Sequence, residues 1–131
     1  MQQRPINPWT WQDNFGFSQG VEFTGQQRVL LCAGQTSVDD DGNPVNAGDM
    51  TAQVNKALDN LEAVLAKADM TLANVVRMNI YTTDIQAIFG ALPAWGARLS
   101  AGGCKPASTL LGVAGLAFPE LMVELEATAV A

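Results

Sequence analysis

Residues 50–68 read MTAQVNKALDNLEAVLAKA, and this stretch carries the clearest structural pattern in the chain. Its apolar residues recur at the three- and four-residue spacing of one helix face, while Gln53 and the other polar residues fall on the opposite side. The apolar set is Met50, Val54, Ala57, Leu58, Leu61, Val64, Leu65 and Ala68. Asp49 or Thr51 stands where a helix N-cap is expected. The pattern predicts an amphipathic helix packed on a hydrophobic core.

The chain after this helix alternates strands with one more helix. Residues 75–82 (VVRMNIYT) read as a strand, and Asp84 is placed to cap a second helix that ends at Gly102-Gly103. Pro93 lies within this helix and is expected to kink or shorten it. Two closing strands are predicted over 107–114 and 122–130. The apolar face of the second helix comprises Ile85, Ile88, Phe89, Leu92, Trp95 and Leu99.

Two strands are also predicted ahead of the first helix. Residues 17–23 alternate apolar and polar side chains as a half-buried strand does, and 28–33 form a continuous apolar run typical of a strand buried on both faces. The turn residues 25–27 between them favour a hairpin. A further short strand near the N-terminus remains open, and the acidic stretch 39–44 is interpreted as a solvated turn.

These elements predict one α+β domain spanning residues 1–131, with no internal linker or repeat. The expected order is β-β-α-β-α-β-β, with both helices on the same face of one mixed sheet, which makes two layers. The opposite sheet face is then left bare. Only 15% of the residues are charged, against 48% hydrophobic, so we expect subunit association to cover part of the surface.

Composition excludes several classes of function. The net charge of −6 opposes binding to nucleic acid, and no apolar run approaches the roughly 20 residues of a membrane span. The absence of histidine removes Ser-His-Asp and Cys-His catalysis and the commonest zinc ligand, and we expect neither a metal nor a cofactor. Cys32 and Cys104 form no disulfide framework and follow a polar N-terminus, so we expect a reduced, cytoplasmic protein.

Four segments in a specific order resemble the RidA family, also called YjgF or L-PSP proteins. They are residues 17–21 (FSQGV), 33–35 (AGQ), 76–84 (VRMNIYTTD), and the ending that runs from Pro106-Ala107-Ser108 through 123–130 (VELEATAV). The resemblance covers nearly the whole chain from about Phe15 onward. It implies a chorismate-mutase-like fold, a barrel-shaped trimer with three clefts between subunits, and, for the best-known members, hydrolysis of enamines and imines to keto acids and ammonia.

Carried over residue by residue, the resemblance implies a rebuilt substrate pocket. The position of the family's substrate-clamping arginine is Ser108, and a hydroxymethyl group cannot replace the two charge-assisted hydrogen bonds that a guanidinium makes to a carboxylate. Phe17, Ala33, Leu92 and Leu110 stand where the family carries tyrosine, serine, asparagine and cysteine. The resemblance therefore implies substrate-binding roles for these five positions and disfavours 2-imino acids as substrates.

The one polar group of that pocket that is retained is Glu124. Glu124 and Glu126 share one side of the last strand, and Val123, Leu125 and Ala127 are expected to face the helices. The resemblance implies that Glu124 is a catalytic carboxylate that orients water, while Glu126 is interpreted as structural. Two hypotheses follow: a hydrolase of enamine or imine type with an altered substrate, or a trimer that holds a neutral small molecule without turnover. Ribonuclease activity ranks third, given the charge and the absent histidine.

Other candidates keep simpler interpretations. Cys104 lies beside Lys105, which could lower a thiol pKa, but the favoured interpretation is an incidental loop cysteine, and Cys32 is assigned to packing. Arg77 is predicted to form an ion pair or a subunit contact. Trp9 and Trp11 form either a flexible flank or a lid over a neighbouring subunit, and the sequence does not separate these two possibilities.

Overall fold

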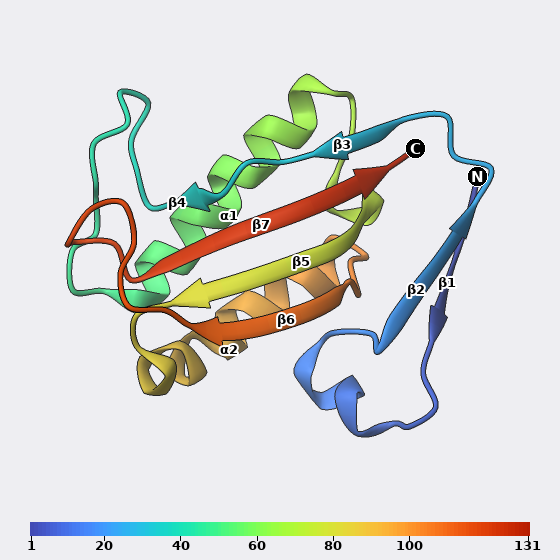
Figure 1. The fold of residues 1–131 in the computed structure, drawn as a ribbon, viewed down its shortest axis with the longest axis horizontal. Coiled ribbons are helices and arrows are strands. Elements are labelled where there is room, and N and C mark those ends of the chain that lie inside the picture. Colours follow the sequence, from blue (N-terminus) through green and yellow to red (C-terminus); the bar gives the residue numbers. More distant parts are fainter.

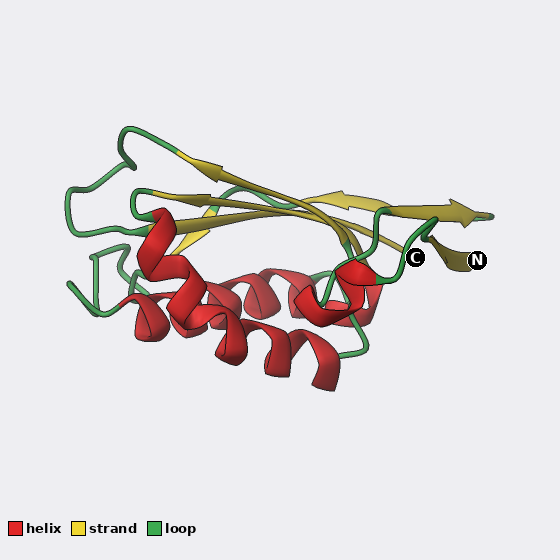
Figure 2. Cartoon of the chain, turned by 90° about the horizontal axis from the view of Figure 1, so that it is seen from below, coloured by secondary structure: helices red, strands yellow, loops and turns green.

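The computed structural model describes residues 1–131, with two long helices on one face of a mixed β-sheet and a separate two-stranded sheet beside it (Figure 1). Figure 2 shows the layers edge-on, with both long helices on the same side of the sheet. The α+β class predicted from the sequence is confirmed. In chain order the elements are β1 (Gln2–Ile6), the 3-10 helix η1 (Trp11–Phe15), β2 (Gly20–Thr24), β3 (Val29–Leu31), β4 (Gln35–Thr36), α1 (Met50–Lys67), the 3-10 helix η2 (Leu72–Asn74), β5 (Val75–Thr82), α2 (Ile85–Ala101), β6 (Ala107–Gly112) and β7 (Val123–Val130).

The main sheet has the strand order β3-β7-β5-β6, and β4 pairs with the same edge of β7 as β3. β5 and β6 are parallel because α2 carries the chain back between them, and the other pairs are antiparallel. β5 and β7 are therefore central, and over most of their length both alternate buried residues with partly or fully exposed ones. The alternation follows from the layering, since the helices cover only one face of the sheet.

Helix α1 begins where the sequence predicted. The Asp49 carboxylate accepts a hydrogen bond from the Ala52 N–H at 3.0 Å and caps the first turn. One residue of the predicted polar side was misplaced: Gln53 is completely buried. Its amide nitrogen donates to the Glu120 and Asn46 carbonyl oxygens at 2.8 and 3.2 Å, and its oxygen accepts from the Met122 N–H at 2.8 Å. Gln53 thereby ties α1 to the chain that leads into β7.

Helix α2 runs from Ile85 to Ala101 with Asp84 as its N-cap, as predicted. The Asp84 carboxylate accepts from the Ala87 N–H at 2.9 Å. Pro93 does not end the helix, which continues for two more turns. The predicted apolar face divides in two, because Ile88, Trp95 and Leu99 are buried in the core whereas Phe89 is 53% exposed.

The predictions for β3 were wrong in two respects. Val29 and Leu31 are 55% and 76% exposed, because β3 is an edge strand and no helix covers its second face. The predicted hairpin with residues 17–23 does not form either. β2 pairs with β1, the additional N-terminal strand, and after the turn at Gly25 the chain bonds instead to Ala131 at the sheet edge.

None of the helices is long and apolar enough to cross a bilayer.

Candidate functional site

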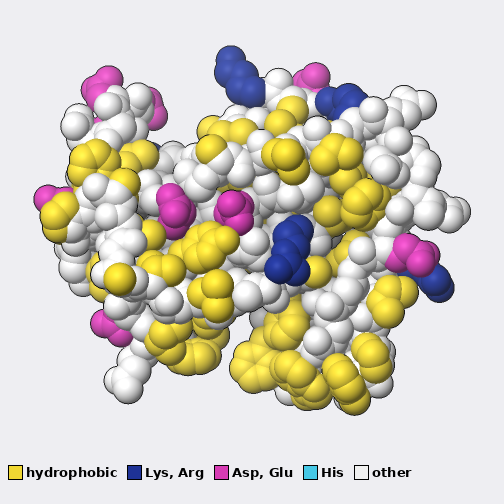
Figure 3. All heavy atoms as spheres, in the orientation of Figure 1, with side chains coloured by type: hydrophobic (Ala, Val, Ile, Leu, Met, Phe, Trp, Pro, Cys, Tyr) yellow, Lys and Arg dark blue, Asp and Glu magenta, His cyan; other side chains and the backbone are white.

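An aromatic pocket opens at the β6 edge of the sheet, between α2 and the N-terminal segment. Its volume is about 230 Å³. Figure 3 shows hydrophobic side chains on both sides of a notch at this margin of the molecule. The N-terminal segment, β5, α2 and β6 all contribute to the pocket. Its lining consists of Trp11, Phe15, Phe17, Ile80, Phe89, Leu92, Trp95, Ser108 and Leu110.

The strand register explains why β6 contributes Ser108 and Leu110. These two residues pair with Met78 and Ile80 of β5, which are buried beneath the helices. Because paired residues on adjacent strands share a face, Ser108 and Leu110 also point toward the helix side. β6 is an edge strand, so its helix-side face remains accessible beside α2.

The N-terminal wall of the pocket is held against the start of β6. The Ser18 N–H donates to the Pro106 carbonyl oxygen at 3.0 Å, and the Ser18 hydroxyl donates to the Lys105 carbonyl oxygen at 2.7 Å. These bonds place Phe17 beside β6, and the left-handed Gly16 (φ 72°) ends η1 and turns its residues over α2. The Trp11 ring meets the Phe17 ring edge-on at 5.8 Å between centroids. The segment therefore forms one wall of the pocket.

The aromatic pocket contains no charged side chain, and Ser108 is its only polar residue. Lys105 lines two neighbouring hollows instead. Arg98 is engaged on α1, where it donates to Asp59 Oδ1 at 2.7 Å, to the Asn55 carbonyl oxygen at 2.8 Å and to Glu62. No cation is thus available to hold a ligand carboxylate inside the pocket.

Glu124 lies elsewhere, on the face of the sheet that no helix covers. It pairs with Tyr81 of β5 and Thr36 of β4, while its neighbours Val123 and Leu125 are fully buried toward the helices, as predicted. Its side chain lies directly over Gly34. A Cβ atom at that glycine would come within 2.5 Å of Glu124 Oε1 and 2.6 Å of Cδ. Glycine at position 34 therefore makes room for the Glu124 carboxylate.

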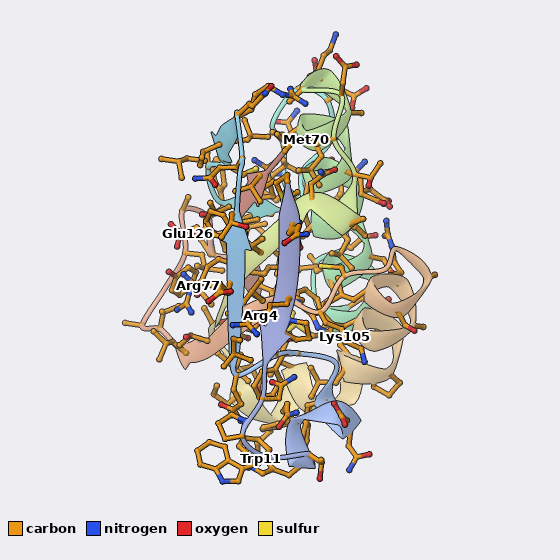
Figure 4. All side chains as sticks on the ribbon, turned by 90° about the vertical axis from the view of Figure 1, so that its right-hand side faces the viewer. Arg4, Trp11, Met70, Arg77, Lys105 and Glu126 are labelled. Carbon is orange, nitrogen blue, oxygen red and sulfur yellow. The ribbon has the colours of Figure 1, made fainter.

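Glu126 shares this open face and has the denser set of contacts. Its Oε1 accepts hydrogen bonds from Asn79 Nδ2 at 3.0 Å and from the Tyr81 hydroxyl at 2.8 Å. These bonds hold the pKa of Glu126 below its ordinary value, and the bond to Glu126 raises the pKa of Tyr81. Arg77 donates to Thr109 Oγ1 at 2.9 Å and makes no ion pair, contrary to one of its two predicted roles. Figure 4 shows Glu126 and Arg77 on the side of the sheet away from Lys105 and the helices.

Neither cysteine is placed for chemistry. Cys104 is 2% exposed, and burial raises the pKa of its thiol to about 12, so the adjacent Lys105 does not activate it. Cys32 is also buried, and burial raises its thiol pKa, in agreement with a packing role. No three side chains of the metal-binding types gather at one place.

Comparison with known proteins identifies the family. The family described as Endoribonuclease L-PSP matches residues 12–131. The chain belongs to this family. The RidA resemblance seen in the sequence is thereby confirmed.

Members and solved structures agree with this assignment. The chain is 37% identical to YyfB of the Rid protein family from Yersinia pestis, with a TM-score of 0.89 and complete coverage of both chains. It is 30% identical to protein DfrA from Myxococcus xanthus over 87% of this chain and 84% of that protein. The structure of TdcF from E. coli, which contains bound serine, is 22% identical with a TM-score of 0.72, and it covers 88% of this chain and 87% of its own. At that identity the likeness to TdcF concerns the fold.

The site residues inferred from the L-PSP resemblance fall into two groups in this chain. Phe17, Leu92, Ser108 and Leu110 meet in the aromatic pocket. Ala33 and Glu124 lie at the other side of the sheet, since the residues flanking Ala33 join strands that pair with the far edge of β7. The two groups are also on opposite faces of the sheet. One chain of this L-PSP protein therefore does not bring Glu124 to Ser108.

The pocket contains five residues that the family positions did not indicate. Phe89 and Trp95 belonged to the apolar face predicted for the second helix, Ile80 to the strand predicted over 75–82, and Phe15 preceded the first predicted strand. Trp11 had been left between a lid and a flexible flank. The usable sequence signal was the clustering of aromatic residues over 9–17, but nothing local indicated that this segment would meet α2.

Proposed function

We propose that this chain, as one RidA-like domain over residues 1–131, binds a small molecule in clefts between the subunits of a homotrimer. The aromatic pocket of one subunit forms one wall of each cleft, with Phe17, Leu92, Ser108 and Leu110 as substrate-binding residues. The neighbouring subunit provides the facing wall, with Ala33 as a binding residue and Glu124 as the catalytic carboxylate. The favoured reaction is hydrolysis of an enamine or imine that carries no carboxylate.

The separation of the two residue groups carries this proposal. Ser108 lies on the edge strand β6 and faces the helices. Glu124 lies on β7, with β5 between the two strands, and faces the open side of the sheet. A ligand against Ser108 can meet a Glu124 carboxylate only if a second copy supplies it. Val29, Leu31 and Leu111 are 55%, 76% and 50% exposed, and such apolar surface favours association.

The proposed chemistry is addition of water to a carbon–nitrogen double bond. The Glu124 carboxylate accepts a proton from water as the water oxygen bonds to the carbon, and the electron pair of the double bond moves to the nitrogen, which takes that proton from Glu124. The proton of the new hydroxyl group then passes through Glu124 to the nitrogen, and the carbon–nitrogen bond breaks to leave the carbonyl and an amine or ammonia. The aromatic pocket holds the apolar part of the substrate. A 2-imino acid would bury its carboxylate there without a cation, which is unfavourable.

The second candidate is a trimer that binds a neutral molecule without turnover. The observation that favours it is the composition of the aromatic pocket, whose lining is apolar or aromatic apart from the Ser108 hydroxyl and has no charged side chain. Such a lining is suited to retention of an apolar ligand. Which candidate holds depends on whether Glu124 reaches the ligand in the assembly.

Light scattering tests the assembly. The chain mass is 13.9 kDa, and we expect a particle of three times that mass at micromolar concentration. A stable monomer would refute both the trimer and the cleft.

Turnover tests the chemistry. We expect hydrolysis of an uncharged imine but little hydrolysis of 2-iminopropanoate, with ammonia or amine release as the readout. Glu124→Gln should abolish turnover, or change ligand affinity for a non-catalytic binder, while the trimer persists. Glu126→Gln is the matched control on the same strand face, and it should affect stability or assembly more than binding. If the two variants exchange these effects, the role assigned to Glu124 is wrong.

Despite the family's description, we propose no interaction with RNA. The net charge of −6 and the absence of histidine support this exclusion. We also propose a cytoplasmic location, which the same composition fits. A mobility-shift assay that detected RNA binding at physiological salt would contradict it.

A further inference from the structure

The walls of the aromatic pocket are richer in rings than retention of a small aliphatic molecule requires. Five of its nine lining residues are aromatic, three are aliphatic and one is Ser108. The rings come from two sides, with Phe89 and Trp95 on α2 facing the N-terminal group. That group consists of Trp11, Phe15 and Phe17.

We infer that the ligand of this pocket is an uncharged aromatic molecule of one or two rings with a single hydrogen-bonding group directed at the Ser108 hydroxyl. The inference rests on the proposed small-molecule function and names its ligand class. It departs from ligands that are anchored by a carboxylate, because the pocket provides no positive charge.

The size of the pocket sets the number of rings. A cavity of about 150 Å³ with an apolar lining takes up benzene. The aromatic pocket measures about 230 Å³, so it has room for a substituted benzene or a fused pair of rings such as indole. Larger polycyclic molecules would project out of the pocket.

The arrangement of the rings favours an aromatic ligand over an aliphatic one of equal size. Trp11 meets Phe15 and Phe17 edge-on, with ring centroids 6.3 and 5.8 Å apart. These contacts fix the orientation of the Trp11 ring before a ligand binds. Trp11, Phe15 and Phe89 are each at least 52% exposed at the mouth of the pocket. A flat ring between them covers this surface and adds edge-to-face contacts that a saturated ring cannot make.

Charge discriminates in the same direction. An anionic ligand meets a protein of net charge −6 and a lining without lysine or arginine. The Ser108 hydroxyl can donate or accept one hydrogen bond, which suits a phenolic or alcoholic hydroxyl, an indole N–H or a neutral imine nitrogen. The last of these connects the ligand class to the proposed hydrolysis.

Amide-proton NMR of the full chain tests the inference, because two of its three tryptophans line the pocket. Benzyl alcohol and indole should shift the indole N–H signals of Trp11 and Trp95 and leave Trp9 unchanged. Cyclohexylmethanol is the matched saturated compound and phenylacetate is the matched charged compound. Each should bind with an affinity at least about tenfold lower than that of benzyl alcohol.

Two variants assign the binding to the pocket. Phe89→Ala should weaken benzyl alcohol binding about tenfold. Phe118→Ala removes a phenyl ring of similar exposure outside the pocket and should leave the affinity unchanged. Ser108→Ala should weaken benzyl alcohol binding but not toluene binding, since toluene has no group for the hydroxyl.

Several outcomes would overturn the inference. Equal or tighter binding of cyclohexylmethanol or phenylacetate excludes the aromatic class. Absence of any shift at Trp11 and Trp95 with millimolar ligand excludes the site, and signals that respond only to protein dilution mean that a second copy fills the pocket. In each case, turnover of an aliphatic neutral imine that Glu124→Gln abolishes would still support the proposed function, so the two failures are distinguishable.

Discussion

Gly34→Ala should impair the function of Glu124 while leaving the folded chain intact. The new methyl group would lie 2.5 Å from Glu124 Oε1 and 2.9 Å from its Cγ. Comfortable contacts between non-bonded heavy atoms begin near about 3.5 Å, so the carboxylate must move by roughly 1 Å. The atoms in the way belong to a flexible side chain and not to the backbone, so the side chain yields first.

The stability effects of this substitution nearly cancel. Gly34 has no left-handed backbone conformation, so alanine fits the chain there and stabilises by about 0.4–1 kcal/mol through the unfolded state. Forcing the Glu124 side chain off its preferred rotamer costs about 0.5–1.5 kcal/mol. The net change in unfolding free energy is therefore within about 1 kcal/mol. A catalytic group displaced by roughly 1 Å can lose about 100-fold in rate.

The assay is imine turnover, or ligand affinity if no turnover is found, together with urea unfolding at one fixed chain concentration. Gly115→Ala is the matched control, because a Cβ atom there meets nothing within 4 Å. We expect Gly115→Ala to match the parent in function and Gly34→Ala to match it in stability alone. Parent-like activity of Gly34→Ala would show that the position of the Glu124 carboxylate does not matter, and the catalytic role would be refuted.

Three further predictions concern the supports of the site. Gln53→Ala removes three buried hydrogen bonds and should lower the unfolding free energy by about 3 kcal/mol in urea denaturation, whereas the exposed Gln86→Ala should change it by less than about 0.5 kcal/mol; equal effects would contradict the role of Gln53. The pKa of Glu126 in the folded chain is lower than its ordinary value of 4.5. The hydrogen bonds of its carboxylate therefore stabilise the fold at pH values above 4.5, and this stabilisation is lost as the pH falls through the lower folded-state pKa. The stability difference between the parent and Glu126→Gln should accordingly shrink below pH 4.5, and a difference independent of pH would argue against these bonds. Since burial raises the pKa of Cys104 to about 12, iodoacetamide should modify it at neutral pH only after unfolding, as mass spectrometry would show; rapid labelling of the folded chain would contradict this.

The aromatic pocket and the Glu124 carboxylate are positioned by different parts of the fold. The pocket needs α2 and the N-terminal segment to meet at the β6 edge, and the Ser18 bonds to the chain before β6 secure that meeting. Glu124 needs only the alternation of β7 and the space over Gly34. Substitutions at Ser18 and Gly34 therefore affect the two halves of the proposed cleft separately.

Patterns that depend on neighbours in sequence predicted the helices and the central strands well. The apolar spacing and the Asp49 and Asp84 caps located α1 and α2, and residues 75–82 form β5 as expected. The alternation of residues 123–127 correctly separated the core side of β7 from the side that carries Glu124. Each of these signals arises within a few residues, so the rest of the fold does not alter it.

Strand pairing and burial could not be obtained in this way. Residues 28–33 are apolar whether they form a buried strand or an edge strand, and only the final sheet order leaves Leu31 exposed. A hairpin is the shortest way to pair β2 with β3, but β2 gains a partner in β1 and β3 gains one in β7. Gln53 looked like a surface residue because its buried hydrogen-bond partners lie as far as 69 residues away.

The sequence by itself determined the family, the two-layer α+β class, the acidic charge and the lack of histidine, because each depends on residue identity or local periodicity. Only the tertiary structure decided that Phe17, Leu92 and Ser108 share a pocket while Glu124 lies on the opposite face. It also brought Trp11 to that pocket, about a hundred residues from Leu110 along the chain. The physical reason is that a side chain's neighbours are set by strand order and by the burial of surfaces from distant segments, and no local pattern encodes these.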